Sequence, residues 1–175
     1  GSTKILDAMN RGYTKEEYIK LAKKIKEKIP DIGLTTDIIV VFPGETDEDF
    51  QDTMDVVNEV GFENAFMFMY SKRSGTPAAT MEGQVDEHTK NERLQQLMRL
   101  QNMKAKEESQ KYLGKIVKVL VEGPSKKNPE MLTGRSSTHK IVLFKSDRKD
   151  LKGKFVNTRI YDAKTWTLYG ELVEE

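Results

Sequence analysis

The sequence has 175 residues, no cysteine and a formal net charge of +1. That length allows one domain of ordinary size and a small second one, each with its own core. The lack of cysteine excludes disulfides, thiolate nucleophiles and cysteine-ligated metal centres within these residues. No apolar run approaches the roughly 20 residues that a membrane helix needs, so we expect a cytoplasmic protein with no membrane partner.

The two parts of the chain differ in charge. Residues 1–111 carry 16 Lys and Arg against 20 Asp and Glu, a net charge of −4, and residues 112–175 carry 13 against 8, a net charge of +5. A basic C-terminal module is compatible with a polyanionic partner. It is equally compatible with an ordinary protein surface, so charge alone does not decide between the two.

Two helices are predicted at the start of the chain. The first is short and runs from Thr3 toward Gly12. The second begins at a capping box, in which the Thr14 side chain and the Glu17 side chain satisfy each other's backbone N–H groups, and it ends at Pro30.

The stretch from Leu34 to Thr46, LTTDIIVVFPGET, is where we expect a ligand site. It begins as an apolar strand, breaks at Pro43-Gly44 and enters an acidic helix start. Strand–loop–helix units of this kind build ligand sites in α/β proteins. Asp37 interrupts the apolar run. Because a carboxylate is costly to bury unpaired, we expect it either in a structural salt bridge or hydrogen bond, which we favour, or facing a wet cavity.

A second unit of the same kind follows. A helix from Thr46 to Gly61 precedes the strand NAFMFMY at residues 64–70, whose Met67 and Met69 are expected in the core. Two helix–strand units predict parallel strands with crossover helices, so both loops should open on one edge of the sheet. Two strands do not make an independent sheet of this class, so we expect the last part of a larger α/β domain.

The remaining chain predicts a long helix and a small barrel. Residues 87–113 form a highly charged helix, interpreted as a connector whose charges are solvated. The hydrophobic period then changes to two, and five short strands are predicted, KIVKVLVE, MLTGRSS, HKIVLF, GKFVNTRIYD and TLYGELVE. They predict a small antiparallel OB-like β-barrel, so we place the domains at 1–111 and 112–175.

Basic side chains of the predicted barrel are suited to contact with phosphates. They are Lys126, Lys127, Arg135 and Lys140. Tyr161, Trp166 and Tyr169 could stack on bases, but in a small barrel we favour core positions for them.

Four separated segments carry a resemblance to a known family. GSTKILDAMNRGYT, TTDIIVVFPGETDEDF, FMYSKRSGTPAA and VEGPSKKNPEMLTGRSS resemble, in this order, the C-terminal half of the MiaB-type tRNA methylthiotransferases. The resemblance covers essentially the whole chain. It implies the C-terminal part of a partial radical-SAM TIM-like barrel, followed by a TRAM domain that binds RNA.

The resemblance implies chemistry that needs residues outside this sequence. Members of the family hold two 4Fe-4S clusters on cysteines of their N-terminal regions. The missing N-terminal part of the same polypeptide would therefore be a partner of the residues in this sequence. One cluster cleaves S-adenosylmethionine to a deoxyadenosyl radical that attacks C2 of an N6-prenylated adenosine beside the tRNA anticodon, and the other supplies sulfur. The implied substrate is therefore tRNA, and these 175 residues are expected to be inactive alone.

The resemblance also implies the residues of the cofactor site. They are Ile39 and the turn Phe42, Pro43, Gly44 and Glu45, with Ser2 and Arg11 as further contacts. Apolar Ile39 could pack on a purine face, and Arg11 could pair with a carboxylate. The alternative is that the turn merely closes a strand. The family usually has glycine where Val41 stands, and a branched side chain there would hinder close approach of a cofactor.

Asp37 and Arg73 are candidates for contact with the substrate or RNA. Both favour a tRNA enzyme over the related ribosomal-protein methylthiotransferases, which resemble this chain less at these two positions. The threonylcarbamoyl-adenosine tRNA methylthiotransferases share the arginine, and the segment SKKN…LTGR favours the MiaB type over them. An alternative of another class is a stand-alone RNA-binding protein whose α/β part is structural. A parent reading frame without an upstream Cys-x-x-x-Cys-x-x-Cys motif would support this alternative.

Overall fold

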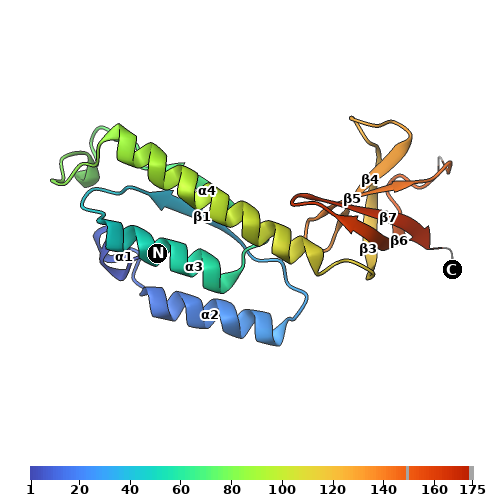
Figure 1. Ribbon diagram of the computed structural model, residues 1–175, viewed down its shortest axis with the longest axis horizontal. Coiled ribbons are helices and arrows are strands. Elements are labelled where there is room, and N and C mark those ends of the chain that lie inside the picture. The colour runs from blue at the N-terminus through green and yellow to red at the C-terminus, as the bar shows by residue number, and fades with distance from the viewer. Residues whose placement is uncertain (149, 174–175) are drawn as a thin grey trace. The chain divides into compact units, whose positions relative to one another are not determined.

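The computed structural model describes residues 1–148 and 150–173, and the chain divides into two compact units, Gly1–Lys104 and Ala105–Glu175. The first unit contains α1 (Thr3–Ala8), α2 (Lys15–Lys28), β1 (Thr35–Val40), α3 (Asp47–Val60), β2 (Asn64–Met69), the 3-10 turn η1 (Pro77–Ala79) and most of α4 (Glu87–Gln110) (Figure 1). The second unit contains the end of α4 and the strands β3 (Ile116–Pro124), β4 (Met131–Ser136), β5 (Ile141–Lys145), β6 (Phe155–Ala163) and β7 (Thr167–Val173).

The two strands of the first unit are parallel, as predicted. Ile39 of β1 lies opposite Phe68 of β2, and Asp37 lies opposite Phe66. Because the carboxyl ends of parallel strands meet at one edge, the loops that follow β1 and β2 open on the same edge of the sheet.

The core of the first unit lies on one face of this sheet. Val40 of β1 packs there with Phe50 and Val57 of α3 and Leu97 of α4. The predicted core residues Met67 and Met69 are half-buried and pack against the same cluster. In Figure 1, α2 and α3 run beside each other along β1.

The other face of the sheet is open. Ile39, Phe66 and Phe68 are 38%, 58% and 52% exposed. Their register shows that they are neighbours on one face. The sheet therefore presents a partly exposed apolar surface on this face.

Helix ends follow the predicted signals at most positions. Thr14 and Glu17 form the predicted capping box, and Gly61 ends α3 in a left-handed conformation. The predicted first helix is shorter than expected, because α1 ends at Ala8 and Asn10 turns to a φ of +57°.

The five predicted strands of the second unit form a closed barrel in the order β3-β4-β5-β7-β6. The barrel is not purely antiparallel as predicted, since β5 and β7 pair in parallel. The other four ladders are antiparallel. Strand direction cannot alternate all the way round a ring of five strands, so closure requires one parallel pair.

Some side chains of α4 and the barrel differ from their predicted environment. Arg93 of α4 is buried although the charges of this helix were expected to be solvated. Tyr161 and Trp166, expected in the barrel core, are 56% and 44% exposed.

Among the described residues, none of the helices is long and apolar enough to cross a membrane.

Candidate functional site

The residue that follows β1 has a strained backbone. Val41 has a φ of +62° and is 1% exposed. A β-branched residue rarely adopts this left-handed conformation, because its side chain crowds the backbone. The Val41 N–H donates to Glu45 Oε2 at 2.9 Å, so a side chain from four residues further on fixes this conformation.

The carboxylate of Glu45 is buried and holds the loop together. Its Oε1 accepts from Nη1 of Arg93 at 3.0 Å, and the same nitrogen donates to the Glu45 carbonyl oxygen at 3.1 Å. Burial raises the pKa of Glu45, while the Val41 N–H and the Arg93 guanidinium act in the opposite direction. The loop between β1 and α3 is therefore fixed by its own acid and by α4.

A second acid fixes the start of α3. Asp49 accepts hydrogen bonds from Ser2 Oγ at 2.7 Å, from Lys4 Nζ at 2.8 Å and from the Thr46 N–H at 2.9 Å. Burial acts to raise the pKa of Asp49, but the bonds from Lys4, Thr46 and Ser2 outweigh it and hold the pKa well below its usual range. Asp49 is therefore a carboxylate at neutral pH.

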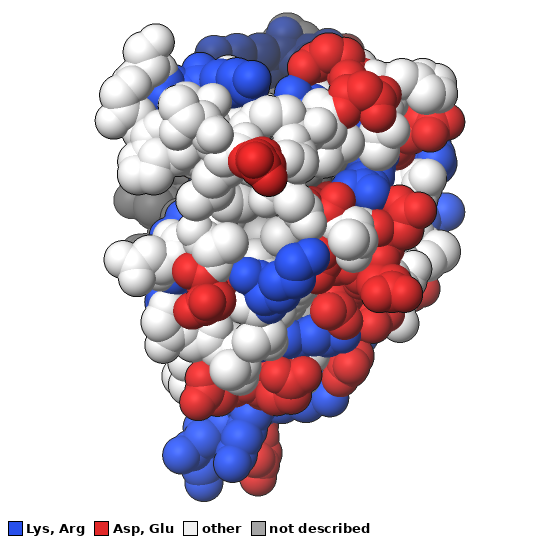
Figure 2. All heavy atoms as spheres, turned by 90° about the vertical axis from the view of Figure 1, so that its left-hand side faces the viewer, with Lys and Arg blue, Asp and Glu red and all other residues white. Residues whose placement is uncertain are grey.

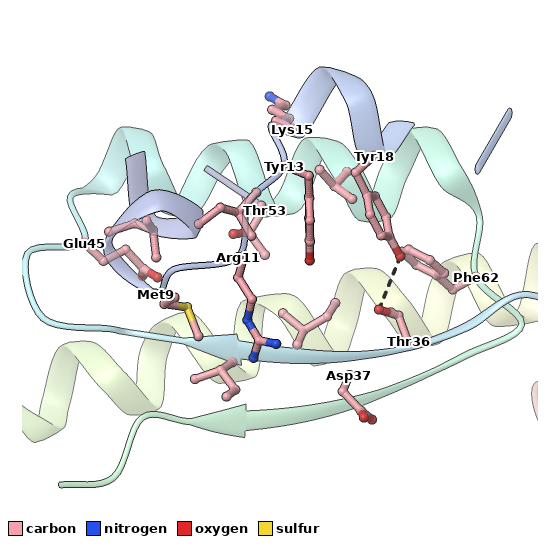
Figure 3. A pocket seen from close by; sticks show the side chains of 16 residues that line it. Met9, Arg11, Tyr13, Lys15, Tyr18, Thr36, Asp37, Glu45, Thr53 and Phe62 are labelled. Carbon is pink, nitrogen blue, oxygen red and sulfur yellow. Dashed lines mark hydrogen bonds between the residues drawn. The ribbon is translucent and has the colours of Figure 1, made fainter. Parts of the chain in front are cut away.

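A pocket of about 240 Å³ lies beside β1 (Figure 3). Arg11, Tyr13 and Tyr18 line one side of it, and β1 lines the other. Figure 3 shows the Arg11 guanidinium reaching toward the strand, while the Tyr18 hydroxyl donates to Thr36 Oγ1 at 3.4 Å. The pocket thus combines a cation, aromatic rings and apolar side chains of β1, which suits a ligand with a carboxylate and a flat ring.

The structure brings three of the predicted cofactor residues together at this pocket. Arg11, Ile39 and Glu45 all line it. Ile39 is partly exposed and available to a ligand, whereas both carboxylate oxygens of Glu45 are engaged inside the protein.

The other predicted cofactor residues are not among those that line the pocket. Ser2 is buried, caps α1 and donates its hydroxyl to Asp49. Phe42 and Pro43 are buried in the turn. Gly44 is exposed with a φ of +81°, and a Cβ there would meet nothing within 4 Å. Glycine is favoured at this position because of its left-handed backbone conformation. Crowding by neighbouring atoms is not the reason, since a Cβ would have room.

Asp37 and Arg73 are both exposed. Asp37 lines the pocket rim, and Figure 3 shows its carboxylate pointing away from Tyr18 and Thr36. Among the described residues, no ion pair or side-chain hydrogen bond is seen for Asp37, which favours the wet-cavity interpretation over a structural salt bridge. Arg73 lies in the loop after β2, which opens on the same edge as the loop after β1.

The predicted RNA-binding residues of the barrel differ in availability. Lys126 and Lys127 are exposed in the loop between β3 and β4. Arg135 is exposed but pairs with Glu122 at 3.0 Å. Lys140 is buried, and its ammonium donates to Ser109 Oγ at 2.9 Å inside the second unit. A phosphate would therefore reach the two loop lysines most directly.

Charge on the first unit is mixed. Figure 2 shows acidic side chains gathered on one side of the face it presents, with lysines and arginines among them, and a largely uncharged area beside them. The first turn of α3 alone carries Asp47, Glu48 and Asp49. This face offers no continuous basic surface to a polyanion.

The described residues do not provide a metal centre. They contain no group of three or more His, Cys, Asp or Glu side chains placed to hold a metal ion. Since the sequence has no cysteine, thiolate ligands of an iron–sulfur cluster do not come from these 175 residues.

Comparison with known proteins identifies two domains. Residues 1–57 match the Radical SAM superfamily, and residues 110–173 match the TRAM domain. The chain is 62% identical over 173 residues to the tRNA-2-methylthio-N(6)-dimethylallyladenosine synthase of Fusobacterium nucleatum, covering 99% of this chain and 40% of that protein. It is 58% identical over 173 residues to the synthase of the same name from Acetivibrio thermocellus, covering 99% of this chain and 36% of that protein.

The matched region is only part of each relative. The synthase of Bacillus cereus is 54% identical over the whole of this chain, which covers 34% of it. The chain therefore spans about two fifths or less of the length of these curated relatives.

Proposed function

We propose that this chain, which belongs to the family of MiaB-type tRNA methylthiotransferases, is the part of such an enzyme that walls the cofactor site and binds tRNA. The whole polypeptide would add a methylthio group to C2 of N6-prenylated adenosine beside the anticodon. The observation that carries this proposal is the 62% identity, over 99% of the chain, to a synthase named for that product. A tRNA substrate would place the protein in the cytoplasm.

The cofactors of the proposed enzyme are S-adenosylmethionine and two 4Fe-4S clusters, which would supply the radical and the sulfur. The clusters do not fit these residues, because thiolate ligands are lacking. Their cysteines would lie in the missing N-terminal part of the same polypeptide. We therefore assign no step of cluster chemistry to this chain.

S-adenosylmethionine fits the pocket beside β1 better. Ile39 offers an apolar surface to the adenine ring, and Arg11 offers a cation to the carboxylate of the methionine part. The buried carboxylate of Glu45 would act indirectly, by holding the turn that borders the site. Binding and orienting the cofactor, and excluding water from it, are the contributions we propose for these residues.

The free edge of β1 supports a partial barrel built with further strands. β1 pairs with β2 on one side only within the described residues. The pocket lies along the other edge, since it is lined by Thr36 and Ile38 from one face of β1 and by Asp37 and Ile39 from the other. We propose that a strand of the radical-SAM barrel pairs with this edge in the whole polypeptide, which leaves the part of the pocket on the Ile39 face of β1 to the cofactor. We also propose that residues 1–111 and 112–175 are the two domains.

The tRNA would bind the barrel of the second unit through Lys126 and Lys127, with Arg135 beside them. The TRAM match over residues 110–173 and the exposure of these side chains support this assignment. Asp37 and Arg73, at the rim and at the neighbouring loop, would face the part of the substrate that reaches the cofactor.

The test is a substrate panel for the whole polypeptide with its clusters reconstituted. It should convert N6-dimethylallyladenosine in tRNA to the 2-methylthio product, detected by mass spectrometry of nucleosides. The tRNA with N6-threonylcarbamoyladenosine and the ribosomal protein should remain unmodified. Failure to modify the prenylated tRNA, or preference for another substrate of the panel, would refute the proposal.

A further inference from the structure

Arg93 of α4 is a buried charge beside the loop that follows β1, and the proposed chemistry does not use it directly. Its side chain is 9% exposed, and its guanidinium lies 5.7 Å from the centre of the Phe50 ring. Taking an arginine out of water is unfavourable unless its donors are satisfied. Both Nη atoms of Arg93 are bonded, whereas its buried Nε has no partner among the described residues. The bonds it makes therefore indicate what it is for.

The side-chain hydrogen bonds of Arg93 go to Glu45, in the loop after β1, and to the first residue of α3. Nη1 donates to both the carboxylate and the carbonyl oxygen of Glu45, and Nη2 donates to Asp47 Oδ1 at 2.7 Å. One planar group thus binds a backbone carbonyl, a buried acid and the first residue of α3. Lysine has a single charged nitrogen and does not reproduce this fork of donors.

The segment that Arg93 holds is the one with the strained conformation. Glu45 uses its other oxygen to accept the Val41 N–H, and Val41 is the left-handed residue at which the chain leaves β1. A strained backbone persists only where surrounding contacts determine it. The chain of contacts runs from Arg93 through Glu45 to Val41, two residues beyond Ile39 of the proposed cofactor site.

Gly44 is fixed from two further directions. Its N–H donates to the carbonyl oxygen of Gly83, and its carbonyl oxygen accepts from Lys4 Nζ at 3.1 Å. The Lys4 side chain is 61% exposed, so its bond is open to competition from water. Arg93 is the buried member of this set and is the group best placed to keep the turn in one conformation.

We propose that Arg93 is a positioning residue for the cofactor: through Glu45 it holds the end of β1 and the following turn in the shape that receives S-adenosylmethionine. This inference rests on the proposed function. Arg93 itself does not line the pocket, so its effect on the cofactor is indirect. It should change cofactor affinity and leave tRNA affinity unchanged.

The experiment uses the whole polypeptide with its clusters, as wild type and as Arg93→Lys and Arg93→Met. Arg99→Lys and Arg99→Met are the matched controls, because Arg99 is an exposed arginine on the same helix. Equilibrium binding of S-adenosylmethionine, KM for each substrate, kcat and thermal unfolding are measured for each. For both Arg93 variants we expect the Kd and KM for S-adenosylmethionine to rise about tenfold, with the KM for tRNA unchanged and the controls like wild type.

A purely structural role gives a different pattern. It would lower the melting temperature and the active fraction, and hence the apparent kcat, while the Kd and KM for S-adenosylmethionine stayed at the wild-type value. That result for Arg93→Lys would overturn the inference. If Arg93→Met does not fold, the Kd and KM of Arg93→Lys for S-adenosylmethionine decide between the positioning role and the purely structural role. A wild-type polypeptide that fails to bind S-adenosylmethionine would instead refute the proposed function.

Discussion

The backbone N–H of Val41 and the carboxylate of Glu45 are joined by a hydrogen bond of 2.9 Å across the turn that ends β1. Val41 adopts a φ of +62° at this point, and its side chain is buried. The bond and the burial compensate for a conformation that disfavours a branched side chain. Glycine in place of Val41 would reach the same conformation without that strain.

The strain at Val41 predicts an unusual order of stability for two variants. Val41→Ala and Val41→Gly remove nearly the same buried group. At an ordinary position glycine costs about 0.5–1 kcal/mol relative to alanine, but a left-handed conformation costs an L-residue about 1–2 kcal/mol. In urea unfolding, Val41→Gly should therefore be at least as stable as Val41→Ala.

Val57 is the matched control for this comparison, because it is equally buried but lies within α3. There Val57→Ala should be more stable than Val57→Gly by about 1 kcal/mol. If Val41 showed the same order as Val57, the left-handed conformation of Val41 would not be that of the folded protein.

The low pKa of Asp49 predicts a loss of stability in acid. Its pKa is depressed in the folded state, so its contribution is present above the unfolded value of about 3.9 and is lost as the pH falls below it. Asp49→Asn should cost about 1–2 kcal/mol at neutral pH, because it weakens the cap of α3 and the contact with Lys4. The difference from wild type should shrink as the pH is lowered from about 5 to 3.

Asp7→Asn is the control for the acid experiment. Asp7 is exposed on α1, and no side-chain bond is seen for it among the described residues. It should match wild type in chemical unfolding at every pH. A gap between wild type and Asp49→Asn that stayed constant with pH would show that the Asp49 carboxylate is not selectively stabilised.

The two exposed lysines of the barrel predict a salt-dependent loss of tRNA binding. Lys126→Ala with Lys127→Ala should weaken tRNA binding at low salt and reduce the slope of log K against log salt by roughly one to two. The exposed pair Lys23 and Lys24 on α2 provides a control with the same change of charge. Equal tRNA affinity of the two double variants would argue against the proposed RNA surface.

Local signals in the sequence predicted the elements well. The capping box of Thr14 and Glu17, the stop at Gly61 and the change of period after Gly114 depend on neighbouring residues, so they could be recognised without tertiary information. Parallel pairing of β1 and β2 followed from the order of helices and strands.

The environment of individual side chains could not be predicted in the same way. Arg93 resembles the other charges of α4, and its acids Glu45 and Asp47 lie 48 and 46 residues away in the chain. Lys140 was expected at an RNA surface, but the barrel buries it beside Ser109. These outcomes depend on how distant elements pack, and a single sequence carries no local signal for that.

In the proposed enzyme, the pocket beside β1, on its Ile39 face, receives S-adenosylmethionine while the barrel receives tRNA. The most direct test is the Kd of S-adenosylmethionine for the whole, cluster-loaded polypeptide with Ile39→Ala, beside Lys126→Ala with Lys127→Ala. We predict that Ile39→Ala weakens cofactor binding about fivefold and leaves tRNA affinity unchanged, and that the lysine variant does the reverse. Unchanged cofactor affinity in Ile39→Ala would contradict this division.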